Sequence, residues 1–148
     1  IRDRVRDALD YRKWFEFRMF FKRGEEQKKP LTNAAFNRFS GGEKAMAMYV
    51  PLFAAVNAQY KKAENKDHPR MIALDEAFAG VDDKNISSMF ELVHKLDFDY
   101  IMNSQALWGC FETVKGLRIA ELLRPQNSRI VSVIRYTWNG KERMLDEQ

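Results

Sequence analysis

The sequence predicts an α/β fold in which short parallel strands alternate with helices and a small antiparallel sheet follows. Two apolar runs, 71–74 and 99–104, have the length of strands and end in polar side chains, which is typical of buried parallel strands. The segments 42–62 and 83–95 have the length of helices. After residue 117, apolar and polar side chains alternate between turn signals, which predicts an antiparallel hairpin or meander. A chain of 148 residues can bury one sizeable core.

The composition excludes several classes of protein. Apolar residues make up 45% of the chain and aromatic residues 13%, which is typical of a globular domain and argues against disorder. No apolar run reaches eighteen residues and the first residues are charged, so we expect neither a membrane span nor a secretory leader, and a cytoplasmic location. A single cysteine, Cys110, and two histidines predict neither an internal disulfide nor a zinc site.

The positive charge is concentrated at the start of the chain. The net charge is +4, and residues 1–30 carry ten basic and six acidic side chains, whereas the remainder carries fifteen of each. A local excess of this kind is a candidate for contact with DNA phosphates, although a solvated face is the commoner explanation.

The first forty residues are expected to form a helix end, a strand and a loop. Residues 1–10 have apolar side chains at helical spacing. Residues 11–21 alternate instead, which predicts a core strand rather than a surface for stacking nucleic-acid bases. Residues 24–37 are polar and contain turn residues, which predicts a loop. The apolar face of the predicted strand consists of Tyr11, Phe15, Phe17, Met19 and Phe21.

The organising motif of the chain is Phe-Ser-Gly-Gly-Glu-Lys at residues 39–44. Ser40 and Glu43 have the spacing of a capping box, so the simplest interpretation is a helix start. That interpretation leaves Gly41 and Gly42 unexplained, because glycine is costly there unless the backbone must approach something closely. A phosphate fits, since the glycine N–H groups, the Ser40 hydroxyl and the positive end of the helix dipole together attract an anion.

The second motif is a strand that ends in two acids. The helix predicted at 42–62 contains Pro51, which should kink or locally break it. The strand at 71–74 follows, and Asp75 and Glu76 come directly after it. Such acids are often only solubilising, but next to a glycine-bearing helix start they suit metal-assisted phosphoryl transfer.

The remaining elements follow in order. Asp82 precedes the helix at 83–95 and by itself indicates only an N-cap. Gln105 lies just past the strand at 99–104. Two alternating segments, 118–124 and 129–137, predict a hairpin. The Asn-Gly pair after them predicts a third antiparallel strand that runs through residue 145.

Taken together and in this order, the motifs resemble the C-terminal lobe of an SMC-like ABC-type ATPase head, over nearly the whole chain. The resemblance implies an ATPase that uses ATP and Mg²⁺. It makes residues 40–44 a signature motif, in which Ser40, Gly41 and Gly42 contact the γ-phosphate of ATP held by a second head and Glu43 and Lys44 complete the motif.

The same resemblance assigns the remaining site residues. It implies that Asp75 serves the magnesium, that Glu76 is the catalytic carboxylate and that Asp82, in the D-loop, reaches across the head dimer. Gln105 occupies the switch position, where the family usually has a histidine. Glutamine can bond a phosphate or a water but cannot carry histidine's charge, so a sensing role at this position is in question.

The family's architecture implies a divided head. Residues 1–10 would end the returning coiled coil and residues 11–148 would form the C-terminal lobe. None of the seven glycines begins a G-x-x-x-x-G-K-[ST] phosphate loop, so the N-terminal lobe that carries it is absent from this chain, which alone is predicted to be inactive. The implied partners are that lobe, a second head in a homodimer, and DNA, with a nucleoid-associated location and no membrane contact.

Within SMC-like proteins, the segments 10–17 and 133–140 and Gln105 look most like the ATPase subunit of Wadjet-type plasmid-defence systems, which are relatives of the MukB-like condensins. That resemblance implies kleisin-like and nuclease subunits as partners and loop extrusion or DNA organisation as the activity. Two alternatives stay open: a DNA repair ATPase of the SbcC type, and a non-catalytic interaction module that retains the fold.

Overall fold

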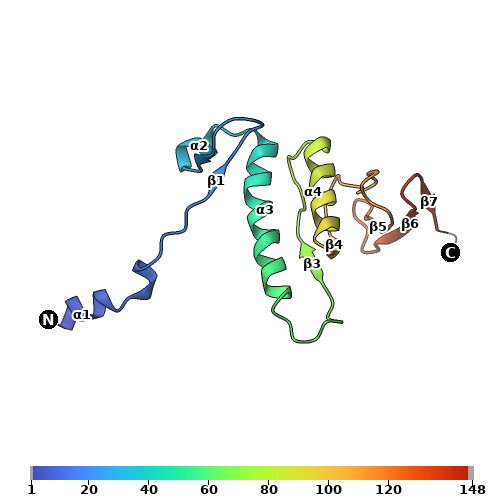
Figure 1. The fold of residues 1–148 in the computed structure, drawn as a ribbon. Coiled ribbons are helices and arrows are strands. Elements are labelled where there is room, and N and C mark those ends of the chain that lie inside the picture. Colours follow the sequence, from blue (N-terminus) through green and yellow to red (C-terminus); the bar gives the residue numbers. More distant parts are fainter. Residues whose placement is uncertain (1, 147–148) are drawn as a thin grey trace. The chain divides into compact units, whose positions relative to one another are not determined.

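The computed structural model describes residues 2–146, and the chain divides into two compact units, residues 1–39 and residues 40–148. The second unit contains a parallel strand pair with helices, followed by a three-stranded antiparallel sheet (Figure 1). The predicted α/β fold class is therefore confirmed. None of the helices in the described part of the chain is long and apolar enough to cross a membrane.

The first unit is small. Its elements are α1 (Arg2–Ala8), a single 3-10 turn (Tyr11–Lys13), β1 (Phe20–Phe21), β2 (Lys29–Pro30) and α2 (Asn33–Asn37). The strands β1 and β2 pair in an antiparallel ribbon. Its buried anchor is Phe39, whose ring meets the edge of Phe21 at a centroid distance of 4.9 Å.

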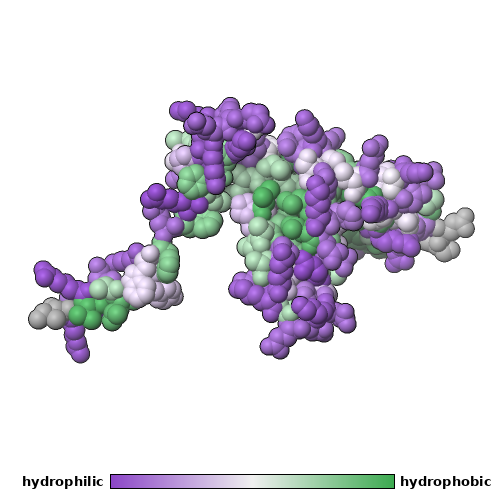
Figure 2. Space-filling view, in the orientation of Figure 1, coloured by the Kyte–Doolittle hydropathy of each residue, from purple (hydrophilic) through white to green (hydrophobic). Residues whose placement is uncertain are grey.

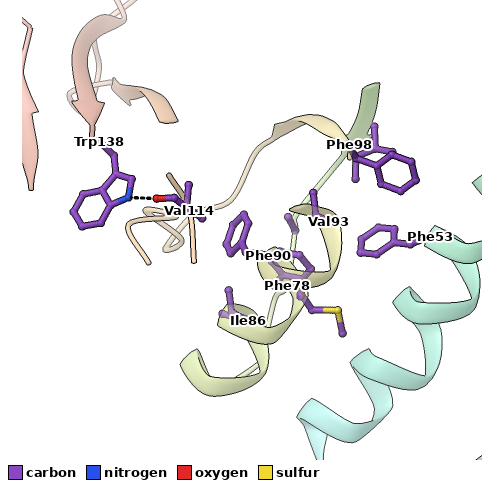
Figure 3. Close-up of a cluster of buried hydrophobic side chains, with 11 residues drawn as sticks. Phe53, Phe78, Ile86, Phe90, Val93, Phe98, Val114 and Trp138 are labelled. Carbon is purple, nitrogen blue, oxygen red and sulfur yellow. Dashed lines mark hydrogen bonds between the residues drawn. The ribbon is translucent and has the colours of Figure 1, made fainter. Parts of the chain in front are cut away.

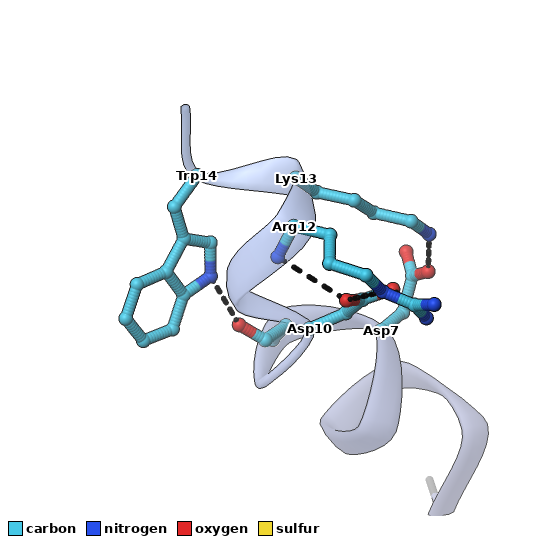
Figure 4. A network of polar contacts seen from close by, with 6 residues as sticks. Asp7, Asp10, Arg12, Lys13 and Trp14 are labelled. Atoms are coloured by element: carbon cyan, nitrogen blue, oxygen red, sulfur yellow. Dashed lines mark hydrogen bonds and ion pairs between the residues drawn. The ribbon is translucent and has the colours of Figure 1, made fainter. Parts of the chain in front are cut away.

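The predicted helix at the start of the chain is confirmed over Arg2–Ala8, and Ile1 lies outside the described residues. Its end is fixed by polar contacts (Figure 4). The Trp14 indole donates to the carbonyl oxygen of Ala8 at 2.9 Å, the Arg12 guanidinium binds Asp10 at 2.7 Å, and Lys13 pairs with Asp7. The helix has no buried residue, and Figure 2 shows apolar surface on it.

The strand predicted over residues 11–21 is wrong for most of its length. Only Phe20–Phe21 pairs, with Lys29–Pro30; Trp14 lies in a bend, and residues 15–19 belong to no helix or strand. Phe15 and Phe17 are 80% and 84% exposed. The alternation of apolar and polar side chains over residues 11–21 shows only which face a strand would bury if it formed. A strand also needs a neighbouring edge to satisfy its N–H and C=O groups, and in the described chain only the Met19 carbonyl oxygen next to β1 has such a partner, the Leu31 N–H at 2.8 Å.

The second unit is built on two parallel strands and two helices. Helix α3 (Gly41–Tyr60) leads to β3 (Met71–Leu74), and α4 (Asp83–Lys95) leads to β4 (Asp99–Met102). The strands pair in register from Met71 opposite Asp99 to Leu74 opposite Met102. Because parallel strands end at the same edge, the segments that follow β3 and β4 lie side by side.

The core of this unit lies between α3, α4 and the strand pair. Phe53 of α3 meets Phe98 at a ring distance of 6.3 Å, and Phe78 meets Phe90 of α4 at 5.6 Å (Figure 3). Its buried members are Phe53, Ile72, Ala77, Phe78, Ile86, Met89, Phe90, Val93, Phe98, Val114 and Trp138.

Two details of this unit differ from expectation. The strands β3 and β4 are half-buried, since Ile72 is covered whereas Met71 and Ile101 are 47% and 62% exposed. Packing on one face leaves every second side chain open. Helix α3 is also continuous through Pro51, so of the predicted kink or local break, the break is wrong. The proline removes one backbone donor, and the burial of Phe53 two residues later favours continuing the helix.

The C-terminal sheet confirms the predicted hairpin and third strand. Its order is β5 (Leu117–Leu123), β6 (Ser132–Trp138) and β7 (Arg143–Leu145), all antiparallel. The β6–β7 turn contains Asn139, whose side-chain oxygen accepts from two following N–H groups, and Gly140, with φ at 92°. The Trp138 indole, at the end of β6, donates to the carbonyl oxygen of Val114 at 2.8 Å.

Candidate active site

The helix start predicted at Ser40 has the capping geometry that the sequence indicates. Ser40 Oγ accepts from the Glu43 N–H at 3.2 Å, and Glu43 Oε2 accepts from the Ser40 N–H at 2.9 Å. The N–H groups of Gly41 and Gly42 have no acceptor in the described part of the chain. Gly41 is exposed and Gly42 is buried. The first turn of α3 therefore keeps backbone donors next to the positive end of its dipole.

The structure explains why residue 42 is a glycine, and the sequence did not reveal this reason. A Cβ at this position would lie 2.1 Å from Asn85 Nδ2 and 2.7 Å from Asp82 Oδ2. A Cβ at Gly41 would lie 3.1 Å from the carbonyl oxygen of Gly80. The turn that precedes α4 thus packs directly onto the start of α3. Close approach does require the glycine at position 42, but the group that approaches is part of the same chain.

Asp82 acts as the N-cap of α4. Its Oδ1 accepts from the Asn85 N–H at 3.1 Å and its Oδ2 accepts from the Asn85 side-chain amide at 2.6 Å. These hydrogen bonds, with the side-chain bond the larger effect, lower the pKa of the Asp82 carboxyl. The carboxylate is exposed. It is therefore ionised at neutral pH and held in one orientation beside Gly42.

The two acids after β3 lie on a sharply turned segment. Asp75 and Glu76 are both exposed, and Ala77 and Phe78, which follow them, are buried. Glu76 has φ at 47° and Phe78 has φ at 58°. Positive φ is uncommon outside glycine and is found at functional sites when surrounding contacts enforce it. The buried residues anchor the turn, and the acids stay in solvent.

Asn103, just past β4, is the contact that enforces this turn. Its Oδ1 accepts from the Glu76 N–H at 2.7 Å, and its backbone oxygen accepts from the Ala77 N–H at 2.9 Å. Its own N–H donates to the Leu74 carbonyl oxygen at 3.1 Å. Sequence reasoning gave Asn103 no role. The available signal was its place as the first polar residue after a strand parallel to β3.

The predicted residues thus fall into two groups. Gly41 and Gly42, at the start of α3, meet Gly80 and the N-terminus of α4 at Asp82 and Asn85, and Asp75 and Glu76 share the strand edge with the segment that carries Gln105. Gln105 is exposed in the bend after β4. Lys44 is partly buried one turn into α3.

Two hollows on the surface of the described chain involve none of these residues. One, of about 390 Å³, is lined by residues of the first unit such as Phe21 and Phe39, and the other, of about 630 Å³, by residues near Cys110 and Trp138. The acids and Gly41 instead lie on exposed surface, and Gly42 is covered by Asp82 and Asn85. An open site of this kind suits residues that act on a ligand held by another polypeptide.

The donor set fits a magnesium ion that arrives with a nucleotide. No three His, Cys, Asp or Glu side chains of residues 2–146 gather closely enough to hold a metal ion by themselves. Mg²⁺ is usually bound by one or two carboxylates together with substrate phosphates and waters. The exposed carboxylate of Asp75, with Glu76 beside it, has that chemistry.

Comparison with known families decides the relationship. The family described as SbcC/RAD50-like, Walker B motif, matches residues 6–95. The chain belongs to this SbcC/RAD50-like family. The match includes residues 39–44, β3 with its two acids, and Asp82, and it supports a relationship to SMC/RAD50-type ABC ATPases. No curated protein matches the chain.

Family membership sets the general chemistry. The Walker B motif of SbcC/RAD50-like proteins indicates ATPase activity in the full-length members and a general dependence on nucleotide and Mg²⁺. The matched range ends at residue 95, so β4, Asn103 and Gln105 lie beyond it. The placement of β4, Asn103 and Gln105 therefore follows from the structure of this SbcC/RAD50-like chain and not from the family match.

Proposed function

We propose that this chain is the signature and Walker B half of an ATPase head that hydrolyses MgATP between two engaged heads. The observation that carries the proposal is the family match over residues 6–95, which contains both motifs. It is supported by the packing of the Asp82 turn on Gly42, because this packing ties the Walker B side of the chain to the start of the signature helix.

The proposed role of the signature motif is to bind the γ-phosphate of ATP held by the second head. The N–H groups of Gly41 and Gly42, the Ser40 hydroxyl and the helix dipole would stabilise the negative charge. Glu43 already completes the capping box and so fixes the direction of these donors. Lys44 would add positive charge one residue further along the helix. Asp82 would contact the second head from beside Gly42.

The proposed chemistry takes place at the turn after β3. Asp75 would hold the magnesium that accompanies ATP, directly or through water, and the ion would supply charge neutralisation at the phosphates. Glu76 would orient a water and accept its proton. The water oxygen then bonds to the γ-phosphorus as the bond from that phosphorus to the bridging oxygen of ADP breaks. Gln105 would contact the phosphate or the water.

The proposed partners are an N-terminal lobe with a phosphate loop and a second head. The lobe is supported by the exposed aromatic side chains of residues 14–20 and by the backbone of residues 15–18, which pairs with no strand of the described chain, because a neighbouring strand would bury the rings and satisfy the backbone. Residues 1–10 would then continue into a coiled coil.

The test of this proposal is ATP hydrolysis by the chain assembled with a phosphate-loop lobe. The wild-type assembly should hydrolyse ATP in the presence of Mg²⁺, and the chain alone should not. Glu76→Gln should abolish turnover and trap an ATP-bound head dimer, detectable as an increase in mass in light scattering. Turnover that survives Glu76→Gln would contradict the role of Glu76.

We also propose that the assembled protein acts on DNA, to organise it or extrude loops. The support is the charge of the first unit, which has eleven basic and six acidic side chains. Arg12, Arg18 and Lys22 already pair with neighbouring acids, which favours a solvated face. Replacing all three should flatten the salt dependence of DNA binding if they meet phosphates, and leave the slope unchanged if they do not.

Two biological settings follow from different observations. The SbcC/RAD50-like match favours a DNA repair ATPase that partners a nuclease. The anti-plasmid setting, with kleisin-like and nuclease subunits, is supported by the sequence likeness of Gln105 and the 133–140 hairpin to Wadjet-type proteins. Within that hairpin, the structure has β6 and the turn that follows it. Two assays distinguish these settings: cleavage of linear DNA ends would favour the repair ATPase, and loss of circular plasmids would favour plasmid defence.

A further inference from the structure

The turn that carries Glu76 has a backbone conformation that non-glycine residues disfavour. A non-glycine residue at φ 47° has its Cβ close to the carbonyl oxygen, a conformation that costs energy and persists only where other contacts impose it. Phe78, two residues later, has the same kind of conformation at φ 58°. The segment between them therefore needs contacts on both sides to stay in place.

Asn103 supplies the contacts on one side. Its three hydrogen bonds reach Leu74, Glu76 and Ala77, so a single residue of the neighbouring strand's end holds the chain before, at and after the acid pair. The backbone bonds would form with any residue at position 103. The bond from the Glu76 N–H to Oδ1, at 2.7 Å, depends on the asparagine side chain.

The core supplies the contacts on the other side. Phe78 is 3% exposed and its ring meets Tyr49 of α3 at a centroid distance of 5.0 Å. The Tyr49 hydroxyl also accepts a long hydrogen bond, 3.4 Å, from the Phe78 N–H. Burial thus fixes Phe78. In the described chain the Glu76 backbone is held by the Ala79 N–H, which donates to its carbonyl oxygen at 3.3 Å, and by one side chain, that of Asn103.

We infer that Asn103 is a positioning residue for hydrolysis, acting through the Glu76 backbone. This inference rests on the proposed function, because it concerns the orientation of the carboxylate that is proposed to activate water. Without the Oδ1 acceptor, the Glu76 N–H loses its partner and the backbone can relax towards negative φ, which swings the side chain away. Rates are sensitive to displacements of about 1 Å at a reacting group.

The arrangement also links two parts of the site. Gln105 lies two residues after Asn103 in the same exposed segment. A contact between Gln105 and a phosphate would therefore shift the position of Asn103, which binds the Glu76 backbone. The Asn103 side chain makes the orientation of Glu76 depend on the position of the segment after β4.

The experiment uses the complete head, this chain assembled with a phosphate-loop lobe, and compares Asn103→Leu with wild type. Leucine has the same branched arrangement of side-chain heavy atoms as asparagine, is larger, and lacks the acceptor. We expect kcat to fall on the order of ten- to a hundredfold with the KM for ATP unchanged. Ser104→Ala is the matched control, because it removes the loop hydrogen bond in which Ser104 Oγ accepts from the Leu107 N–H at 3.2 Å, and it should leave kcat unchanged.

A second measurement separates positioning from folding. In a Glu76→Gln background, Asn103→Leu should cause no further loss of residual turnover and should preserve the ATP-driven association of heads, because Asn103 acts through the carboxylate that is already gone. Asn103→Ala, with a smaller side chain, should repeat the result. Thermal melting of each variant should resemble that of Ser104→Ala.

Several results would overturn the inference. They are an unchanged kcat in Asn103→Leu, an increase in KM alone, an equal further loss in the Glu76→Gln background, or unfolding of both Asn103 variants, which would limit Asn103 to a structural role. A wild-type assembly without turnover is a different outcome, since it would refute the proposed function itself.

Discussion

Replacing Gly42 by alanine tests the packing of Asp82 and Asn85 on the start of α3. The added Cβ would lie 2.1 Å from Asn85 Nδ2, 2.9 Å from Asn85 Cγ and 2.7 Å from Asp82 Oδ2. The amide cannot simply turn aside, because its Nδ2 donates to Asp82 Oδ2 at 2.6 Å. Relief of the clash therefore requires the N-cap of α4 to shift.

The expected cost follows from three opposing effects. Alanine favours a helix over glycine by about 1 kcal/mol. Loss of an N-cap interaction costs about 1 kcal/mol, and overpacking costs about 1–3 kcal/mol. We therefore expect Gly42→Ala to lower the free energy of unfolding by about 1–3 kcal/mol. Asn85→Ala removes two of the three clashing atoms, so the Gly42→Ala change should cost less in that background.

Urea denaturation followed by far-UV circular dichroism measures this difference. Gly41→Ala is the matched control, since it has the same gain in helix propensity and its Cβ meets only the Gly80 carbonyl oxygen at 3.1 Å. A Gly42→Ala variant that is as stable as Gly41→Ala would refute the packing argument.

Two further predictions concern the core. Burial raises the pKa of Tyr100 to about 12 and its hydroxyl has no partner in the described chain, so Tyr100→Phe should raise the free energy of unfolding at neutral pH by about 1 kcal/mol. The unfolded chain ionises this tyrosine near pH 10, so the wild type should lose stability between pH 10 and 12, and the variant should lose less; equal losses in a pH series of urea melts would contradict this. Trp138→Phe should cost about 1–3 kcal/mol, because the Val114 carbonyl oxygen loses its buried donor, and a neutral result by thermal melting would count against that bond.

The elements that the sequence predicted well are those whose signal is local. The Ser40 to Glu43 spacing describes a capping box within one turn, and both of its hydrogen bonds are present. The Asn139-Gly140 pair marks a turn that two adjacent residues determine, and β6 and β7 follow from it. Helix α4 has the predicted bounds, Asp83–Lys95. Each of these depends on neighbours in the chain and not on distant contacts.

The elements that the sequence could not predict depend on contacts between distant residues. The alternation of residues 11–21 is a strong strand pattern, but a strand also requires a neighbouring edge, and the pattern holds no information about it. The reason for Gly42 lies in Asn85, forty-three residues later, and the angle of Glu76 depends on Asn103. The position of Asn103 just past a strand was the one available signal, and it does not say which residue Asn103 contacts.

The central claim, that the signature motif and the Walker B acids of one chain serve two different composite sites, is tested most directly by mixing inactive heads. Ser40→Arg should disable the signature motif and Glu76→Gln the catalytic carboxylate, so assemblies of either variant should be inactive. In a mixed dimer, one site combines the intact Glu76 of one head with the intact Ser40 of the other. Random pairing of equal amounts should therefore restore about a quarter of the wild-type ATP turnover. A mixture as inactive as its components would contradict the account.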